Sequence, residues 1–390
     1  MLSGDPVRLG AVGPLTPPGI AAAGHELLAG MEIAVDEVNA NSGIGGRPLE
    51  LLFENTRGLP AAGVEALERL RAAGACALVG EFHSVVADAL AECADRARFP
   101  FLCSSATLDA LTGRRSPYVF RLAPPQSYGW RVYADFLLAH GFRHVIEVIR
   151  EDVYWNSGAE VLRRQLEPAG VRVSRVAVAP EELAASIARN VETLATAAAP
   201  AIALLLVGYP EPLAGIVHAL ADRNLLTGAL SLGDPAGRAI FPDWWDTVGE
   251  HGAAVTFLSY QLPGRLTQTG RKLANVFPER EGREPSFVAL EGYDTIVAMA
   301  TALEQAPRLD PDSICASLRA TETPGTRAPV CFSTEPDGVV HQQWAWPPIC
   351  VTARAEPGRP LSQADLLWIA SEAGTQHPAR RNASEPDSIR

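Results

Sequence analysis

The sequence predicts an α/β protein built from two doubly wound, mostly parallel sheets. Short apolar runs alternate with longer helical patterns along most of the chain, and strands that alternate with helices imply right-handed β-α-β crossovers. The pattern restarts near residue 128, so each series of elements builds a sheet of its own. The length of 390 residues also exceeds the roughly 250–300 residues that one hydrophobic core supports.

The first series opens with a strand and continues with alternating helices and strands. Its first helix carries Met31, Val35 and Val38 at helical spacing. It ends at the Gly- and Pro-containing stretch 41–48, because Gly adopts left-handed backbone conformations and Pro cannot continue a helix. Strands are expected at Val7–Val12, Leu49–Glu54, Ala75–Val79 and Phe99–Ser104, and helices at Ala29–Asn41, Pro60–Ala73 and Ser84–Arg96.

The second series follows a predicted crossing strand at Arg121–Gln126. Helices are expected at Tyr128–His140, Trp155–Ala169, Ile187–Ala198 and Pro212–Arg223, and strands at His144–Ile149, Val171–Val178, Ala201–Val207 and Ala229–Leu232. Beyond Phe257 the pattern is helical, centred on Thr267–Phe277 and Val288–Gln305. The periodicity fades after Val351, and the polar stretch Glu372–Arg390 is expected to be disordered.

Composition excludes nucleic-acid binding and gives no sign of a membrane span. Thirty-three basic and 45 acidic residues give a net charge of −12, whereas phosphate-backbone binding needs clustered Lys and Arg. The longest apolar stretch, Ala197–Val207, contains Pro200 and is too short to cross a bilayer. Since no secretory leader pattern precedes the first strand, a cytoplasmic location is expected for the chain as written, and an extracytoplasmic one if a leader was removed.

The six cysteines lack any C-x-x-C spacing and several lie in apolar runs. We therefore expect free, buried thiols rather than metal ligands. The possibility of a disulfide stays open for Cys315, Cys331 and Cys350.

Enzyme motifs are missing from the sequence. It contains no G-x-G-x-x-G after the first strand, no P-loop, no G-x-S-x-G and no H-E-x-x-H. The glycine-rich stretch 42–46 follows a helix and precedes a strand, which is the wrong order for cradling phosphates. We expect neither an enzyme nor a metal or cofactor site.

The loops after the strands are the candidate binding site, because ligands of doubly wound sheets bind outside the carboxyl ends of the strands. In the first series these loops are rich in hydroxyls and precede helix N-termini, which suits a carboxylate or amide oxygen. In the second series they offer aromatic side chains and an acid, which suits an apolar body and an ammonium or amide N–H. The loops are Gly13–Thr16, Gly80–Ser84, Ser104–Thr107, Glu151–Trp155, Gly208–Pro210 and Gly233–Pro235. His83 is retained as a candidate because it lies in one of them.

Structural interpretations of the same residues stay open. Ser84 and Thr107 could be helix N-caps, and Asp234 could be a turn residue before Pro235. The remaining candidates Tyr154, Trp155 and Tyr209 could be core or lobe-interface aromatics.

An ordered set of short motifs runs from Val7 to Val351. It comprises Gly30–Asn39, Gly43–Leu49, Leu78–Gly80 with Ser84, Ser105–Thr107, Tyr118–Arg121, Gly208–Tyr209, Glu291–Asp294 and Asp337–Val339. Taken together, this set resembles the type I periplasmic binding proteins, and among them the branched-chain amino-acid and amide-binding subfamily.

The resemblance implies two Rossmann-like lobes joined by a three-strand hinge. The first lobe would comprise residues 6–122 and 258–329 and the second 123–257 and 330–354, with 355–390 as an extension and disordered tail. It also implies that Ser84, Ser105, Ala106 and Thr107 hold the ligand's carboxylate or amide end. The family's aromatic positions fall on Tyr154 or Trp155 and on Tyr209, and its ammonium-binding acid falls on or beside Asp234.

The expected function is capture of a small amino acid or amide-like solute by hinge closure. The resemblance favours the substrate-binding component of an ABC transporter, with a membrane permease as partner. The alternative is a cytoplasmic amide or amino-acid sensor that regulates a partner protein, and an enzyme on a similar scaffold is less favoured. Association into a homodimer stays open.

Overall fold

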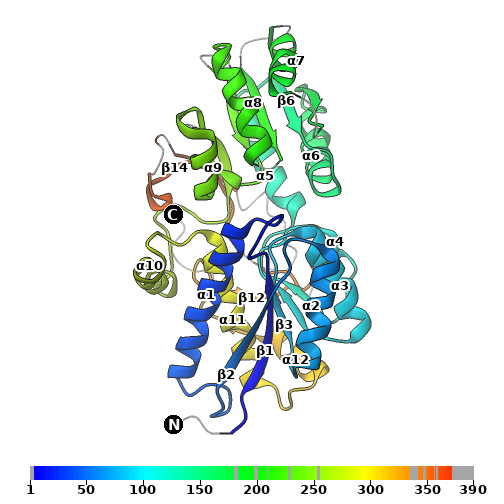
Figure 1. Ribbon diagram of the computed structural model, residues 1–390, viewed down its shortest axis with the longest axis vertical. Helices are drawn as coiled ribbons and strands as arrows, with labels where there is room; N and C mark the ends of the chain where they lie inside the picture. Colours follow the sequence, from blue (N-terminus) through cyan, green and yellow to red (C-terminus); the bar gives the residue numbers. More distant parts are fainter. Residues whose placement is uncertain are drawn as a thin grey trace. The chain divides into compact units, whose positions relative to one another are not determined.

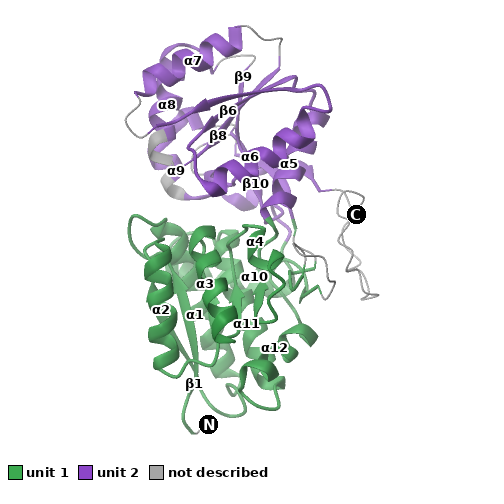
Figure 2. Ribbon diagram, turned by 90° about the vertical axis from the view of Figure 1, so that its right-hand side faces the viewer, with its two compact units in different colours: residues 1–125, 266–348, 376–390 green, residues 126–265, 349–375 purple. Residues whose placement is uncertain are grey.

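The chain divides into two compact units. The computed structural model describes residues 4–179, 183–196, 201–208, 210–226, 230–252, 255–333, 341–345, 348–354, 356 and 359–370. Among these, unit 1 takes the residues of 1–125 and 266–348, and unit 2 those of 126–265 and 349–375 (Figure 2). The chain therefore passes between the units after Pro125, after Arg265 and after Pro348.

Unit 1 is built on a five-stranded sheet in the order β2-β1-β3-β4-β5, in which every neighbouring pair is parallel. Its strands are β1 Val7–Gly13, β2 Leu49–Asn55, β3 Leu78–Gly80, β4 Phe101–Cys103 and β5 Val119–Arg121, with a small hairpin of β11 Glu322–Thr323 and β12 Val330–Cys331. Its helices are α1 Ala21–Ala40, α2 Pro60–Ala72, α3 Ser84–Ala97, α4 Ala110–Gly113, α10 Gln268–Glu281, α11 Phe287–Gln305 and α12 Pro311–Ala320. Figure 1 shows α1 and α11 on one side of the sheet and α2 and α3 on the other.

Unit 2 is built on a seven-stranded sheet in the order β14-β13-β10-β9-β8-β6-β7. Strands β6 to β10 are parallel, and β13 and β14 add an antiparallel edge. The strands are β6 His144–Ile149, β7 Arg172–Ala177, β8 Ile202–Val207, β9 Leu230–Asp234, β10 Thr256–Ser259, β13 Cys350–Ala353 and β14 Asp365–Ile369. The helices are α5 Gln126–Ala139, α6 Val153–Leu166, α7 Ala184–Thr196, α8 Pro210–Asp222 and α9 Pro242–Val248, with 3-10 turns η1 Arg238–Ile240, η2 Gly249–Gly252 and η3 Leu361–Gln363.

Both units use the same strand order. If the parallel strands of each unit are numbered from its own first strand, the order is 2-1-3-4-5 in each. The order reverses between β1 and β3 in unit 1 and between β6 and β8 in unit 2, and such switch points are where doubly wound sheets bind ligands. The predicted α/β class with two parallel, doubly wound sheets is confirmed.

The borders of the units differ from the predicted lobes. Residues 258–265 were expected in the first lobe but belong to unit 2, where β10 pairs with β9 and β13. Residues 330–348 were expected in the second lobe, whereas the described part of this stretch belongs to unit 1. The reason is hydrogen bonding to β5: the Arg121 N–H donates to the Gln342 carbonyl (3.0 Å), and the Trp344 N–H donates to the Arg121 carbonyl (2.9 Å). The predicted crossing strand Arg121–Gln126 is also divided, since Arg121 ends β5 and Gln126 begins α5.

The C-terminal region holds more structure than its fading periodicity predicts. Strand β14 lies within the stretch 355–390, which was expected as an extension and tail, and it pairs antiparallel with β13. An antiparallel edge strand needs no helix to cover it, so it leaves no helical period in the sequence. The segment Glu372–Arg390 lies outside the described residues.

Helix α1 starts at Ala21, eight residues before its predicted start. The early turns are rich in Ala and Gly, which weakens the apolar period. Two glycines explain how α1 packs on α11. A Cβ at Gly30 would lie 2.1 Å from the Ala289 oxygen, and a Cβ at Gly292 of α11 would lie 2.4 Å from the Leu27 oxygen. The two helix backbones therefore approach each other more closely than larger residues allow.

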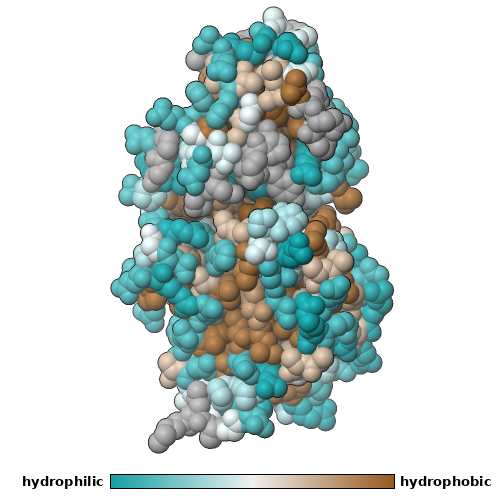
Figure 3. Space-filling view, in the orientation of Figure 1, coloured by the Kyte–Doolittle hydropathy of each residue, from teal (hydrophilic) through white to brown (hydrophobic). Residues whose placement is uncertain are grey.

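Strand β2 forms one edge of the unit 1 sheet. Figure 3 shows hydrophobic residues gathered on the face of unit 1 where β2 runs between α1 and α2. Leu51, Leu52 and Phe53 of this strand are only half-buried. Among the described helices of the whole chain, none is long and apolar enough to cross a membrane.

Replacing Gly30 by Ala tests the close approach of α1 and α11. The added methyl group would meet backbone atoms of Ala289, so Gly30→Ala should lower the free energy of unfolding by about 1–3 kcal/mol. Gly113→Ala is the matched control, because nothing lies within 4 Å of that Cβ position. Denaturant unfolding that shows equal stability for the two variants would contradict the packing described.

Candidate functional site

A buried glutamate organises the loop after β3. Glu81 has a left-handed backbone (φ 74°), and its Oε1 accepts hydrogen bonds from the N–H groups of Phe82 (2.9 Å) and His83 (2.7 Å). Burial raises the pKa of Glu81 to about 7, against the lowering effect of these N–H groups and of the Thr56 hydroxyl. The carboxylate thus satisfies backbone donors at the start of α3.

His83 connects the two loops at the unit 1 switch point. Its Nε2 accepts a hydrogen bond from the Ile20 N–H (3.0 Å). Ile20 precedes α1 in the loop after β1, and His83 ends the loop after β3. A ring nitrogen that accepts from an N–H carries no proton, so this imidazole is in its neutral form with the proton on Nδ1.

Ser84 links the loop after β3 to the loop after β4. Its Oγ accepts hydrogen bonds from the N–H groups of Thr107 (3.2 Å) and Leu108 (3.3 Å). The N-cap positions of α3 and α4 are His83 and Asp109. Neither Ser84 nor Thr107 is therefore a helix N-cap, and the capping interpretation of both is wrong.

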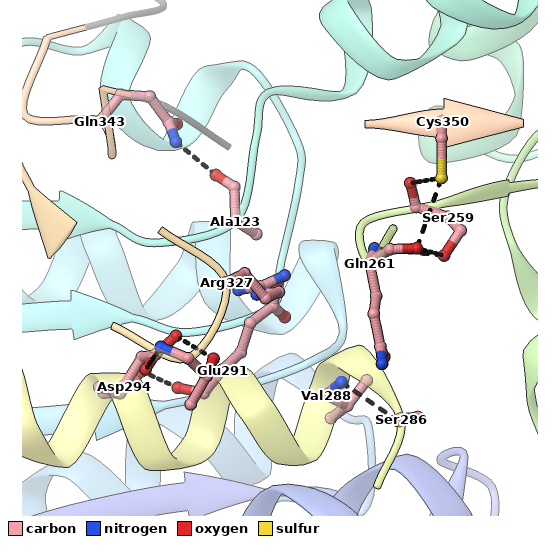
Figure 4. A network of polar contacts seen from close by, with 12 residues as sticks. Ala123, Ser259, Gln261, Ser286, Val288, Glu291, Asp294, Arg327, Gln343 and Cys350 are labelled. Atoms are coloured by element: carbon pink, nitrogen blue, oxygen red, sulfur yellow. Dashed lines mark hydrogen bonds and ion pairs between the residues drawn. The ribbon is translucent and has the colours of Figure 1, made fainter. Parts of the chain in front are cut away.

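Arg121 holds the same loop from its other side. This fully buried guanidinium donates to the carbonyl oxygens of Thr107 (3.2 Å) and Leu108 (2.6 Å), and to the Thr112 hydroxyl (3.1 Å). It also donates to the side chain of Gln343, which in turn donates to the Ala123 carbonyl (Figure 4). Both polar edges of the Thr107–Leu108 backbone are thereby fixed by side chains.

Ser105 and Ala106 are buried between these groups. The Ser105 N–H donates to the Glu81 carbonyl (3.2 Å), and its hydroxyl lies beside the Glu291 carboxyl. The structure thus brings Ser84, Ser105, Ala106 and Thr107 together at the carboxyl ends of β3 and β4. Their role as ligand contacts stays a prediction.

A buried ionic cluster supports this region from α11 (Figure 4). Glu291 pairs with Arg327 (3.2 Å), and Asp294, one helical turn further on, accepts from the Thr326 N–H and hydroxyl (2.7 Å each). The guanidinium carbon of Arg327 lies over the Trp344 ring, 4.9 Å from the ring centroid. Burial raises the pKa of Glu291 to about 7 and that of Asp294 to about 6, although Arg327 opposes both shifts.

In unit 2 the aromatic candidates lie at the start of α6, directly after β6. The Asp152 carboxylate caps the helix by accepting from the Trp155 N–H (2.9 Å). The rings of Tyr154 and Trp155 meet edge to face, 4.8 Å apart. Tyr154 is half-buried, whereas Trp155 is 3% exposed. Gln126 also anchors this turn, since its Nε2 donates to the Tyr154 carbonyl (2.7 Å).

Asp234 ends β9 and is fully buried. Its two carboxylate oxygens accept from the N–H groups of Ala236 (3.0 Å) and Ala239 (2.8 Å). Burial raises the pKa of Asp234 to about 6 against these N–H groups and Arg238. The contacts of Asp234 are thus those of a turn residue, as one interpretation of the sequence expected. A contact between Asp234 and a ligand ammonium stays a prediction. Tyr209 lies outside the described residues.

Arg238, which was not among the predicted site residues, lies beside Trp155 and the end of β8. It starts η1, four residues after Asp234. Its Nη1 donates to the Gly208 carbonyl at the end of β8 (3.3 Å), and its guanidinium carbon lies 5.6 Å from the Trp155 ring centroid. The sequence signal that could have identified Arg238 is its position only three residues after the predicted loop Gly233–Pro235.

A family model for periplasmic binding proteins matches residues 6–346 of the chain. The chain belongs to this family. The Leu/Ile/Val-binding protein homolog 3 of Brucella melitensis is 27% identical over 166 residues, which are 42% of this chain and 45% of the relative. The alignment therefore spans less than half the length of that relative.

Solved structures of the family share the fold over nearly the whole chain. A leucine-binding protein from Thermotoga maritima gives a TM-score of 0.79 at 20% identity, covering 94% of this chain and 99% of that one. A branched-chain amino acid transporter substrate-binding protein from Streptococcus pneumoniae, solved with isoleucine, gives 0.77 at 17%, covering 93% and 99%. The type I periplasmic binding protein fold, expected from the ordered motifs, is confirmed.

The buried carboxyl of Glu81 predicts a pH-dependent stability. Its pKa is about 7 in the folded protein against an ordinary value of 4.5, so the folded state binds more protons between these values. The stabilisation from this group is complete below about pH 4.5 and is lost as the pH rises to about 7, by up to about 3 kcal/mol.

Glu81→Gln should flatten this dependence, because an amide oxygen still accepts from Phe82 and His83 but cannot ionise. Thermal unfolding of both proteins between pH 4.5 and 8 measures the effect. Parallel melting curves for wild type and variant over this range would show that the Glu81 carboxyl does not contribute.

Proposed function

We propose that this protein is the substrate-binding component of an ABC transporter and captures a small amino acid or amide-like solute. Membership of the periplasmic binding protein family supports binding rather than catalysis. The relatives described above are Leu/Ile/Val-, leucine- and isoleucine-binding proteins, which favours an amino-acid-like ligand. A membrane permease would then be the partner that receives the solute.

The observation that carries the proposal is the fixed loop of unit 1. Ser84 and Arg121 hold the N–H and carbonyl groups of Thr107 and Leu108 from opposite sides. A ligand carboxylate or amide gains most from hydrogen-bonding groups that are already ordered, because little entropy is lost on binding. We infer that Ser84, Ser105, Ala106 and Thr107 receive this end of the ligand.

Unit 2 would receive the rest of the ligand. Tyr154 and Trp155 form an edge-to-face pair anchored by Asp152 and Gln126. Aromatic rings cover apolar ligand atoms while their polar ends remain available for hydrogen bonds. The loops at the two switch points differ in chemistry, with hydroxyls in unit 1 and aromatic rings in unit 2.

Hinge closure would convert binding into a signal for the permease. The chain passes between the units three times among the described residues, which suits a hinge made of a few backbone positions. A ligand that contacts both units stabilises the closed form by its differential affinity for the two forms.

Thermal shift against the twenty amino acids, short aliphatic amides and simple aromatic acids tests the binding proposal. A solute that binds only the folded protein raises the melting temperature, and we expect a shift from amino acids or amides. Chromatography of the released solute should then recover it intact and in stoichiometric amount. Turnover of the solute would instead indicate an enzyme.

Thr107→Ala tests the contact proposed for unit 1. The backbone of Thr107 is held by Ser84 and Arg121, so the substitution removes the hydroxyl while the loop keeps these bonds. Loss of a hydrogen bond to a buried ligand oxygen should weaken binding by about 1–3 kcal/mol.

Isothermal titration with the solute found by thermal shift measures this loss. Thr301→Ala is the control, because the Thr301 hydroxyl donates to the Val297 carbonyl within α11 and should leave affinity unchanged. A Thr107→Ala variant with wild-type affinity and lowered stability would assign the hydroxyl a structural role only.

A further inference from the structure

We propose that Arg238 selects ligands that present a carboxylate to unit 2, so that the preferred solutes are dicarboxylates or acidic amino acids rather than neutral ones. The inference rests on the proposed capture of a small solute, and it replaces the neutral, amide-like candidates by solutes that carry a second carboxylate. Three observations carry it: the position of Arg238 beside the ends of β6 and β8, the use of the neighbouring acid, and the support of the turn.

The position of Arg238 is the unit 2 switch point. Its guanidinium donates to Gly208 at the end of β8 and lies over Trp155, which follows the end of β6. Strands β6 and β8 are the neighbours between which the strand order reverses. Although Arg238 belongs to the turn after β9, its charge is thus placed where a doubly wound sheet binds its ligand.

Asp234, the acid expected to bind a ligand ammonium, stabilises its own turn instead. Both oxygens of Asp234 accept backbone N–H groups of the turn, and the carboxylate is fully buried. An ammonium group would have to compete with these N–H groups for the same oxygens. Arg238 lies beside this carboxylate and interacts with its charge, and we infer that it is the group that meets the ligand.

The chemistry of the group favours a carboxylate. A guanidinium presents a planar fork of donors that matches the two oxygens of a carboxylate. The guanidinium carbon lies over the Trp155 ring, within the range of a cation–π contact. The residue is 5% exposed, and a charge held away from water interacts more strongly with an ion that reaches it.

The turn that carries Arg238 is held rigidly. Arg354 of unit 2 donates to the carbonyl oxygens of Ala239 (2.6 Å) and Ile240 (3.4 Å). The guanidinium carbon of Arg354 lies over the Trp245 ring, 4.6 Å from the ring centroid. Its Nη1 donates to the Arg359 carbonyl (3.2 Å). A rigid support keeps the direction of a specificity group fixed, and this turn has one.

The experiment compares ligands that differ only in their distal group. Isothermal titration measures wild-type affinity for glutamate against glutamine, and for succinate against its monoamide, with leucine as a neutral reference. We expect at least tenfold tighter binding of the acid in at least one pair. This comparison uses only the wild-type protein. It therefore tests the preference for an acid even if a substitution at residue 238 prevents folding.

Variants then assign the preference to Arg238. Arg238→Met should weaken binding of the preferred acid at least tenfold and change that of its amide partner less than threefold, while Arg238→Lys should retain part of the preference. Arg223→Met is the control, because Arg223 follows α8 and pairs with Glu192 of α7, at the opposite end of α8 from the switch point. It should leave both affinities unchanged.

Two outcomes overturn the inference in distinguishable ways. Binding of leucine or of the neutral partner with equal or higher affinity than the acid would refute the charge selection and leave the proposed function standing. An acid preference that survives in Arg238→Met would refute the role of Arg238. Failure of every amino acid, amide and dicarboxylate to bind would remove the proposed function, and the inference with it.

Discussion

Parallel strands end in loops whose backbone N–H and carbonyl groups have no neighbours in the sheet, and this protein satisfies them with buried side chains. In unit 1 Glu81 accepts two N–H groups, Ser84 accepts two more from the next loop, and Arg121 donates to the matching carbonyls. In unit 2 Asp234 does the same for its turn. An unsatisfied buried backbone group is costly, so the shape of each loop depends on these few side chains.

The two units differ in the side chains that their loops present at the switch points. They share one strand order, yet the loops at the unit 1 switch point present hydroxyls and an imidazole, whereas those of unit 2 present an edge-to-face pair of aromatic rings and a guanidinium. A common backbone plan thus leaves the choice of ligand to loop residues, which is general for doubly wound folds. The ionic cluster of Glu291, Asp294 and Arg327 lies behind the unit 1 loops and supports them from α11.

Much of this arrangement could be predicted from the sequence, because long β-α alternation and strand-end loops depend on local patterns. The predicted strand His144–Ile149 agrees with β6 at both ends, and the loops that contain Ser84 and Thr107 lie where expected. What failed depends on contacts between distant segments. Arg121 acts through Gln343 across the chain, β14 joins a sheet by antiparallel pairing, and Arg238 reaches from β9 to β8. Hydrophobic periodicity and motif spacing near these residues do not predict such long-range contacts.

The glycine contact between α1 and α11 has a consequence for how the chain is made. Gly30 lies near the N-terminus and Ala289, its neighbour, follows more than 250 residues later. All the parallel strands of unit 2 lie between them in the sequence. During synthesis the first sheet therefore emerges with one side covered by α1 alone, and α11 joins it only after the other unit's parallel strands have been translated. The unit that starts first is completed late, and until then the face of α1 that carries Leu27 and Gly30 has no helix packed against it.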